Sequence, residues 1–219
     1  MINLLVHYWQ SFVQGIGMTA IVSAAAIVLG MLPGLVLAFG LLSRNPLLRA
    51  VSAAYRSFWR GTPILVQLLI VFYFLPTVGI SIPPVLAAIL ALTLNTAAFQ
   101  AEIYRAGLQA IPRGQIEAAR MLGIDTRSIR ARILVPQTFR LMLPAIVSEI
   151  VIIIKNSSLV SVIAVTELTR VSQQVASNSF RPLESFILAG LAYLAINLTV
   201  SGIGLLIEGR LSARGGASL

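Results

Sequence analysis

The chain has 219 residues, of which 58% are hydrophobic and only 11% are charged, and its mean hydropathy is +0.92. Soluble domains are about 45–50% apolar and about 25% charged, so these values exclude an ordinary soluble domain. The formal net charge is +9, cysteine is absent and His7 is the single histidine. This inventory provides no disulfide framework and no Cys or His cluster for a metal site.

Five apolar blocks follow one another along the chain, and each is compared with the roughly 20 residues that a helix needs to cross a bilayer. They cover about residues 12–42, 63–80, 84–104, 143–165 and 183–207. The first block is overlong, and its Gly30, Pro33 and Gly34 predict a kink or a tilted start. The sequence therefore predicts one all-α integral membrane domain over residues 1–219, with about five transmembrane helices.

Basic residues gather in alternate connections between these blocks. The first connection contains Arg44, Arg49, Arg56 and Arg60, and the third, residues 105–140, contains Arg105, Arg113, Arg120, Arg127, Arg130, Arg132 and Arg140. The second connection has no basic residue, and the fourth has only Arg170 and Arg181. The positive-inside rule therefore predicts an outside N-terminus and a cytoplasmic C-terminus. This placement explains the net charge without a nucleic-acid partner. The end of the chain, residues 214–219, is expected to be disordered.

The third connection has helical character in its interior. Residues 115–122 are mostly strong helix formers, and Ile116, Ala119 and Leu122 recur at helical spacing. Gly123 fits a left-handed cap that ends this helix, and Asp125 or Thr126 could cap a second short helix. Pro136 predicts a break before the fourth span. The pattern favours a compact cytoplasmic knob, and the alternative is an ordinary solvated loop.

A longer pattern runs through this connection. It consists of Glu117, Ala118, Ala119, Gly123, Ile133 and Pro136. The spacing resembles the EAA loop of ABC importer permeases, E-A-A-x3-G-x9-I-x-L-P, with Val135 where leucine is usual. Further segments resemble the polar amino-acid uptake group of that family, namely Arg60-Gly61-Thr62-Pro63 with Gln67, Ala101-Glu102 with Arg105, Gly114-Gln115, Pro136-Gln137, Pro144 and Lys155-Asn156-Ser157-Ser158-Leu159.

The resemblance implies a fold, partners and a cellular place. In that family the EAA loop forms a coupling helix that fits a groove on a separate ATP-binding subunit. It implies the ABC type I importer permease fold in a prokaryotic cytoplasmic membrane. It also implies a second permease, identical or paralogous, an extracytoplasmic amino-acid-binding protein, and ATP and Mg bound by the ATPase. Which amino acid is carried stays open.

Several polar residues fall inside the apolar blocks, where a charged group costs about 2.5–3.5 kcal/mol on insertion scales. Glu149 and Asn156 are seven residues apart and share a helix face, whereas Lys155 lies about 120° away from Glu149. One hypothesis is a polar passage whose carboxylate suits an α-ammonium group. Its candidate substrate-binding residues are Glu149, Lys155, Asn156, Ser157 and Ser158. The alternative is that Glu149 and Lys155 pair with neighbouring helices and fix packing or a dimer.

Polar residues of the third block support a plainer interpretation. Thr93, Asn95 and Thr96 are small, and such residues more often form hydrogen bonds between helices. Glu102 and Arg105 are three residues apart, which favours a local ion pair.

Motifs for chemistry are missing from the sequence. No G-x-x-x-x-G-K-[ST] phosphate loop, G-x-S-x-G or H-E-x-x-H occurs, and Lys155, the only lysine, lies in an apolar block. The chain is therefore expected to have no catalytic residues and to need a separate ATPase for ATP-driven work. The main hypothesis is a permease subunit of an ATP-driven amino-acid importer. The alternatives are a stand-alone channel or secondary carrier that uses Glu149, and a structural membrane scaffold.

Overall fold

The computed structural model describes residues 2–213, and every regular element in that range is helical. In chain order these are α1 (Ile2–Leu41), α2 (Pro46–Gly61), α3 (Ile64–Thr77), α4 (Pro84–Gln109), α5 (Arg113–Met121), α6 (Thr126–Ser128), the π-helical η1 (Ile129–Leu134), α7 (Val135–Asn156), the 3-10 helix η2 (Ser157–Ile163), α8 (Leu168–Ser179) and α9 (Pro182–Ala213). The expected all-α architecture is confirmed. The tail 214–219 lies outside the described residues.

Four helical stretches of the described chain are long and apolar enough to cross a membrane. They are Asn3–Leu41, Pro84–Gln109, Thr126–Ile163 and Pro182–Leu211. The pair α2 and α3 gives a fifth if it is one span, although its two helices are bent by 109°. With 14 residues, α3 is about 21 Å long, which is shorter than a hydrocarbon core of about 30 Å.

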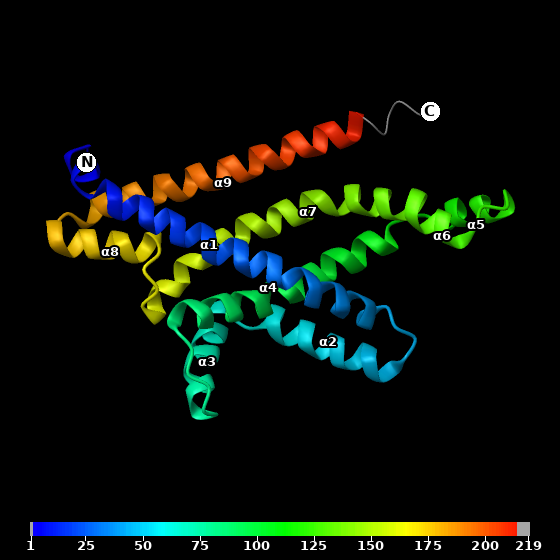
Figure 1. Ribbon diagram of the computed structural model, residues 1–219, viewed down its shortest axis with the longest axis horizontal. Helices are drawn as coiled ribbons and strands as arrows, with labels where there is room; N and C mark the ends of the chain where they lie inside the picture. The colour runs from blue at the N-terminus through cyan, green and yellow to red at the C-terminus, as the bar shows by residue number, and fades with distance from the viewer. Residues whose placement is uncertain (1, 214–219) are drawn as a thin grey trace.

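Helices α1 and α4 form the centre of the molecule, and α7 packs against both (Figure 1). The crossing of α1 over α4 depends on two glycines of α1. A Cβ on Gly30 would lie 2.6 Å from Cγ2 of Thr96, and a Cβ on Gly34 would lie 3.0 Å from Cβ of Gln100. Lipid is as apolar as these helices, so close backbone approach at small residues supplies the packing energy.

The first span differs from its expected form. Helix α1 begins at Ile2, ten residues before the expected start, and its one residue with non-helical dihedral angles is Tyr8. The kink in α1 lies at Tyr8 and not around Gly30, Pro33 and Gly34, where the sequence offered a kink or a tilted start. These glycines allow α4 to approach, and packing along α4 holds the helix through Pro33.

The loop expected at residues 105–140 is much shorter in the structure. Helix α4 continues to Gln109, and the helix that contains α7 already begins at Thr126. The arginines at 127, 130, 132 and 140 lie on this helical extension. Arginines indicate where a helix leaves the membrane, but they do not end the helix. Their long side chains can reach water while the backbone stays helical.

An amphipathic helix, α2, fills the connection between the first two blocks. The side chain of Asn45 accepts hydrogen bonds from the backbone N–H groups of Leu47 and Leu48, and Pro46 occupies the first turn. Arg60 and Gly61 end α2 and Pro63 precedes α3, so Thr62 and Pro63 form the bend between the two helices. The helix before this bend was not predicted from the sequence.

Helices α8 and α5 lie at opposite ends of the molecule (Figure 1). Helix α8 lies beside α9 and the N-terminal part of α1, and α5 lies near the start of α7. Glu167 caps α8, and its carboxylate accepts the N–H groups of Thr169 and Arg170, each at 2.8 Å. The hydroxyl of Tyr193 in α9 donates to the same carboxylate at 2.6 Å. This buried cap fixes α8 to the spans.

Candidate coupling and translocation sites

The candidate coupling site is α5 and the turn that ends it. Gly123 has φ +75°, a left-handed conformation that a residue with a Cβ rarely adopts. Its N–H donates to the carbonyl of Arg120, and the N–H of Ile124 donates to the carbonyl of Ala119. These two bonds form a Schellman motif, so the expected cap at Gly123 is confirmed.

Helix α5 leaves most of its surface uncovered. Only Ala119 is buried, Ile116 is half-buried, and the predicted apolar face does not continue to Leu122. Met121 is 89% exposed and Leu122 is 80% exposed. Two large apolar side chains therefore stand together at the tip of the molecule, on a turn that the cap holds in shape.

Asp125 provides the cap of the second helix, as one of the two expected residues. Its carboxylate accepts the N–H groups of Arg127 at 2.9 Å and Ser128 at 3.0 Å. The pKa of Asp125 is held below its ordinary value by hydrogen bonds from the side chain and backbone of Ser128 and, to a smaller extent, from the backbone of Arg127. The expectation of a separate second short helix is wrong, since this helix continues directly into α7.

The break expected at Pro136 is also wrong. The chain stays helical through this residue, and the preceding turn, η1, is π-helical, with the N–H of Val135 bonded to the carbonyl of Arg130. Proline cannot donate to the fourth residue before it, and the wider π turn accommodates that missing bond. Ile133 of the coupling pattern is half-buried, whereas Ile129, at 2% exposure, anchors this turn.

Glu149, the first candidate translocation residue, lies buried between two helices. It is 4% exposed, and its Oε1 accepts a 2.7 Å hydrogen bond from the hydroxyl of Thr96 in α4. Gln100 donates to the same hydroxyl at 3.3 Å and to the carbonyl of Ile27 at 3.1 Å. Glu149 therefore connects α7 to α4 and, through Gln100, to α1.

The other four candidates lie where α7 passes into η2. Lys155 is exposed and Asn156 is half-buried. The hydroxyl of Ser157 donates to the carbonyl of Ile154, and that of Ser158 donates to the carbonyl of Lys155, both at 2.7 Å. Both hydroxyl protons are thus used within the chain, and their oxygens can still accept a hydrogen bond.

A second buried polar cluster, which the sequence did not predict, lies between α4 and the bend before α3. Asn95 donates to Oε1 of Gln67 at 2.8 Å, and the amide nitrogen of Gln67 donates to Thr62 and to the carbonyl of Trp59. The cluster joins α4 to the bend between α2 and α3. Gln67 and Thr62 belong to the segment singled out by resemblance, which was the available signal. The expected role in bonding between helices is confirmed for Asn95 and Thr96 and is wrong for Thr93, whose buried hydroxyl has no hydrogen-bond partner within the described chain.

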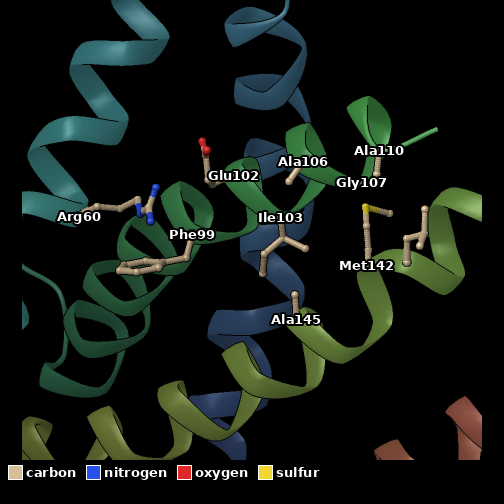
Figure 2. Close-up of a pocket in the computed structure, with 10 residues that line it drawn as sticks. Arg60, Phe99, Glu102, Ile103, Ala106, Gly107, Ala110, Met142 and Ala145 are labelled. Atoms are coloured by element: carbon tan, nitrogen blue, oxygen red, sulfur yellow. The ribbon is translucent and has the colours of Figure 1, made fainter. Parts of the chain in front are cut away.

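A cavity of about 380 Å³ lies between α4 and α7 beside Arg60. Figure 2 shows Arg60 reaching over the ring of Phe99, 5.2 Å from its centroid, and Met142 pointing from α7 toward Gly107 of α4. Glu102 stands at the rim and pairs with Arg105, so the expected local ion pair is confirmed. Arg56 of α2 lies 3.6 Å from the same carboxylate.

Comparison with known proteins identifies the family. The model of the binding-protein-dependent transport system inner membrane component matches residues 26–213. The chain belongs to this family. It is 35% identical over 201 residues to the arginine transport system permease protein ArtQ of Bacillus subtilis, covering 91% of this chain and 92% of that protein. It is 39% identical over 216 residues to the octopine transport system permease protein OccM of Rhizobium radiobacter, covering 91% and 86%.

A solved structure supports the same assignment. The crystal structure of an amino acid ABC transporter with histidines contains a chain that is 36% identical, with a TM-score of 0.87, over 94% of this chain and 96% of that one. The ABC type I importer permease fold is therefore confirmed. As a member of this family the chain is a non-catalytic permease subunit in the bacterial inner membrane. Membership gives no support to a stand-alone channel or secondary carrier.

Proposed function

We propose that this chain is the transmembrane subunit of an ATP-driven importer of a polar amino acid. The observation that carries the proposal is the tip of α5, where Met121 and Leu122 stand exposed on a capped turn within the EAA pattern. A separate ATPase, which binds ATP and Mg, docks on this tip. The docking residues are Glu117, Ala118, Ala119, Gly123, Ile133 and Pro136.

The complex holds two permeases, identical or paralogous, and receives the amino acid from an extracytoplasmic binding protein. The N-terminus is outside and the C-terminus is cytoplasmic, because the arginine-rich segment around α5 belongs on the cytoplasmic side. In this orientation α8, at the end of the molecule opposite α5, lies on the outer side of the membrane, where the binding protein delivers its ligand.

The continuous helix from Thr126 to Asn156 carries motion from the ATPase into the membrane. Glu149 lies 20 residues beyond Ile129, or about 30 Å along the helix axis. Closure of the two ATPases pulls the α5 tips together and shifts α7 against α4. This shift breaks the bond from Thr96 and turns the Glu149 carboxylate toward the passage.

The substrate is bound by residues at the end of α7 and the start of η2, namely Glu149, Lys155, Asn156, Ser157 and Ser158. A carboxylate in a poorly hydrated passage suits an α-ammonium group or a cationic side chain. Lys155 provides a positive charge for a carboxylate, and the serine oxygens accept hydrogen bonds.

Reconstitution tests the proposal. The permease is co-expressed with its cognate ATPase, isolated, and placed in proteoliposomes together with the loaded binding protein. We expect the ATPase to co-purify and uptake to require ATP. Uptake by this chain alone in vesicles without ATP would contradict the proposal and favour the stand-alone channel or secondary carrier instead.

Glu149→Gln tests the substrate contact separately. Loss of a charge-assisted bond of about 1.5–3 kcal/mol should lower coupled uptake by about 10- to 100-fold at limiting substrate. Thr96→Val is the matched control, because it removes the hydroxyl that bonds Glu149 and accepts from Gln100 but keeps the carboxylate, and it should change uptake less than Glu149→Gln. Normal uptake by Glu149→Gln would favour a packing role for Glu149 and leave the coupling proposal standing.

A further inference from the structure

A second, larger cavity opens on the other side of the α4–α7 crossing. Its volume is about 690 Å³, and it lies between the last turns of α1 and α4 and the first turns of the α7 helix. The lining residues are Leu35, Phe39, Tyr104, Leu108, Arg130, Leu134, Val135, Thr138, Phe139 and Met142. Met142 also lines the cavity beside Arg60, and its side chain packs onto Gly107, so it separates the two spaces.

Two polar groups of this cavity lack partners. Thr138 is 4% exposed, yet its Oγ1 forms no hydrogen bond. Arg130 is exposed, and the structure records no acidic partner for it anywhere in the described chain. The Tyr104 hydroxyl is already engaged, since it donates to Gln100 at 2.8 Å. Among the described residues, the cavity is thus lined by one cation without an acidic partner and by one threonine whose buried hydroxyl has no hydrogen-bond partner.

The position of these groups matches the depth profile of a membrane. Leu35 and Phe39 belong to the last two turns of α1, and Leu108 belongs to the last turn of α4, so the cavity lies where these spans end. Arg130 lies on η1, in the arginine-rich segment that follows α4, and Thr138 lies about two turns further along the same continuous helix, on α7. A basic residue at the boundary above an apolar groove is an arrangement that recognises anionic lipid.

The geometry points to a binding site for an anionic phospholipid. Arg130 binds the phosphate, the Thr138 hydroxyl donates to an ester oxygen, and the acyl chains lie along Leu35, Phe39 and Leu108. None of the described residues that line the cavity carries a carboxylate that could bind an ammonium group, so an amino acid is the poorer occupant. The site stands beside η1, between α5 and the spans, where a bound lipid would brace the helix that continues from α6 into α7.

Native mass spectrometry of the whole complex tests the site. The permease and its ATPase are reconstituted in nanodiscs of phosphatidylcholine mixed with phosphatidylglycerol, and the two retained lipids are counted. Wild type should retain phosphatidylglycerol preferentially. Arg130→Gln should lower that preference about fivefold, the factor equivalent to about 1 kcal/mol for one basic side chain near an anionic surface. Thr138→Val, which is nearly isosteric, should lower total retained lipid and keep the preference.

Arg127→Gln is the matched control, since Arg127 is an exposed arginine three residues away that does not line the cavity. Its lipid preference should equal that of wild type, and an equal loss in both arginine variants would overturn the proposal in favour of general loop electrostatics. An unchanged preference in Arg130→Gln would also overturn it. The chain has no cysteine, so efficient disulfide formation between two Leu108→Cys permeases would overturn it too, by showing that a second copy closes the cavity.

Discussion

Two short helices outside the main spans, α5 and α8, use similar local devices but are packed very differently. Helix α5 has nine residues and one of them is buried, whereas α8 has 12 residues and four of them are buried. Each is fixed at one end by local hydrogen bonds, α5 through Gly123 and α8 through Glu167. The difference lies in what covers their apolar side chains.

Helix α8 is complete within this chain. Leu168 and Val171 pack with α1 and α9, and Tyr193 reaches its cap from α9. Helix α5 lacks such packing within this chain, since Met121 and Leu122 at its end are exposed. A helix of nine residues is marginal by itself. The comparison teaches that the α8 end is fixed by packing within this chain, whereas the α5 end, the proposed docking end, leaves its apolar side chains uncovered.

The largest effect is expected from breaking the fixed end. Glu167→Ala removes the acceptor for two backbone N–H groups and for Tyr193, and we expect a loss of about 2–4 kcal/mol in the free energy of unfolding. Thermal unfolding of the purified permease measures it. Glu167→Gln keeps an acceptor oxygen and should lose much less. Equal losses in the two variants would contradict the role given to the cap.

The same residue gives a pH test. Burial raises the pKa of Glu167 above its ordinary value of 4.5, against the opposing effect of its hydrogen bonds. The ionised form is therefore the costly one in the folded state. This cost is absent below the ordinary pKa and grows as the pH rises through the raised pKa. Wild type should lose stability over that rise relative to Glu167→Gln, and parallel pH profiles would show that burial does not raise the pKa.

An intermediate effect is expected from distorting the docking end. Gly123→Val places a β-branched residue at φ +75°, which costs about 1–2 kcal/mol locally and loosens the α5 cap. We expect normal membrane insertion but ATP hydrolysis that is no longer coupled to uptake, measured together in proteoliposomes. Gly123→Asn is the matched control, because asparagine tolerates this conformation, and it should stay near wild type. Coupled uptake at the wild-type rate in the valine variant would remove α5 from the mechanism.

The smallest effect on stability is expected from changing the exposed side chain of Leu122, the residue that directly follows α5. Leu122→Ser should alter the free energy of unfolding by no more than about 0.5 kcal/mol, because Leu122 is 80% exposed. It should nevertheless weaken ATPase docking by about 1–2 kcal/mol, measured by titrating the ATPase onto the reconstituted permease. Leu168→Ser, at a fully buried position of α8, should do the reverse. Similar outcomes at the two positions would erase the distinction between the helices.

Signals that act over a few residues were predictable. Gly123 and Asp125 announced the end of one helix and the start of the next, and the hydrogen bonds that they organise span at most five residues. The break predicted at Pro136 was wrong, because the effect of a proline depends on the preceding turn, which is π-helical here. The bond between Asn95 and Gln67 was unpredictable, because 28 residues separate them and the bend before α3 brings them together.

The sequence by itself determined the membrane class, the family pattern and the cap that ends α5, because hydropathy, charge and turn chemistry are local properties. Only the tertiary structure decided that Glu149 pairs with Thr96, that Glu167 pairs with Tyr193, and that cavities lie on both sides of Met142. These arrangements depend on how closely the helices cross. Within a membrane that distance is set by the fit of small residues on both helices, which no single segment contains.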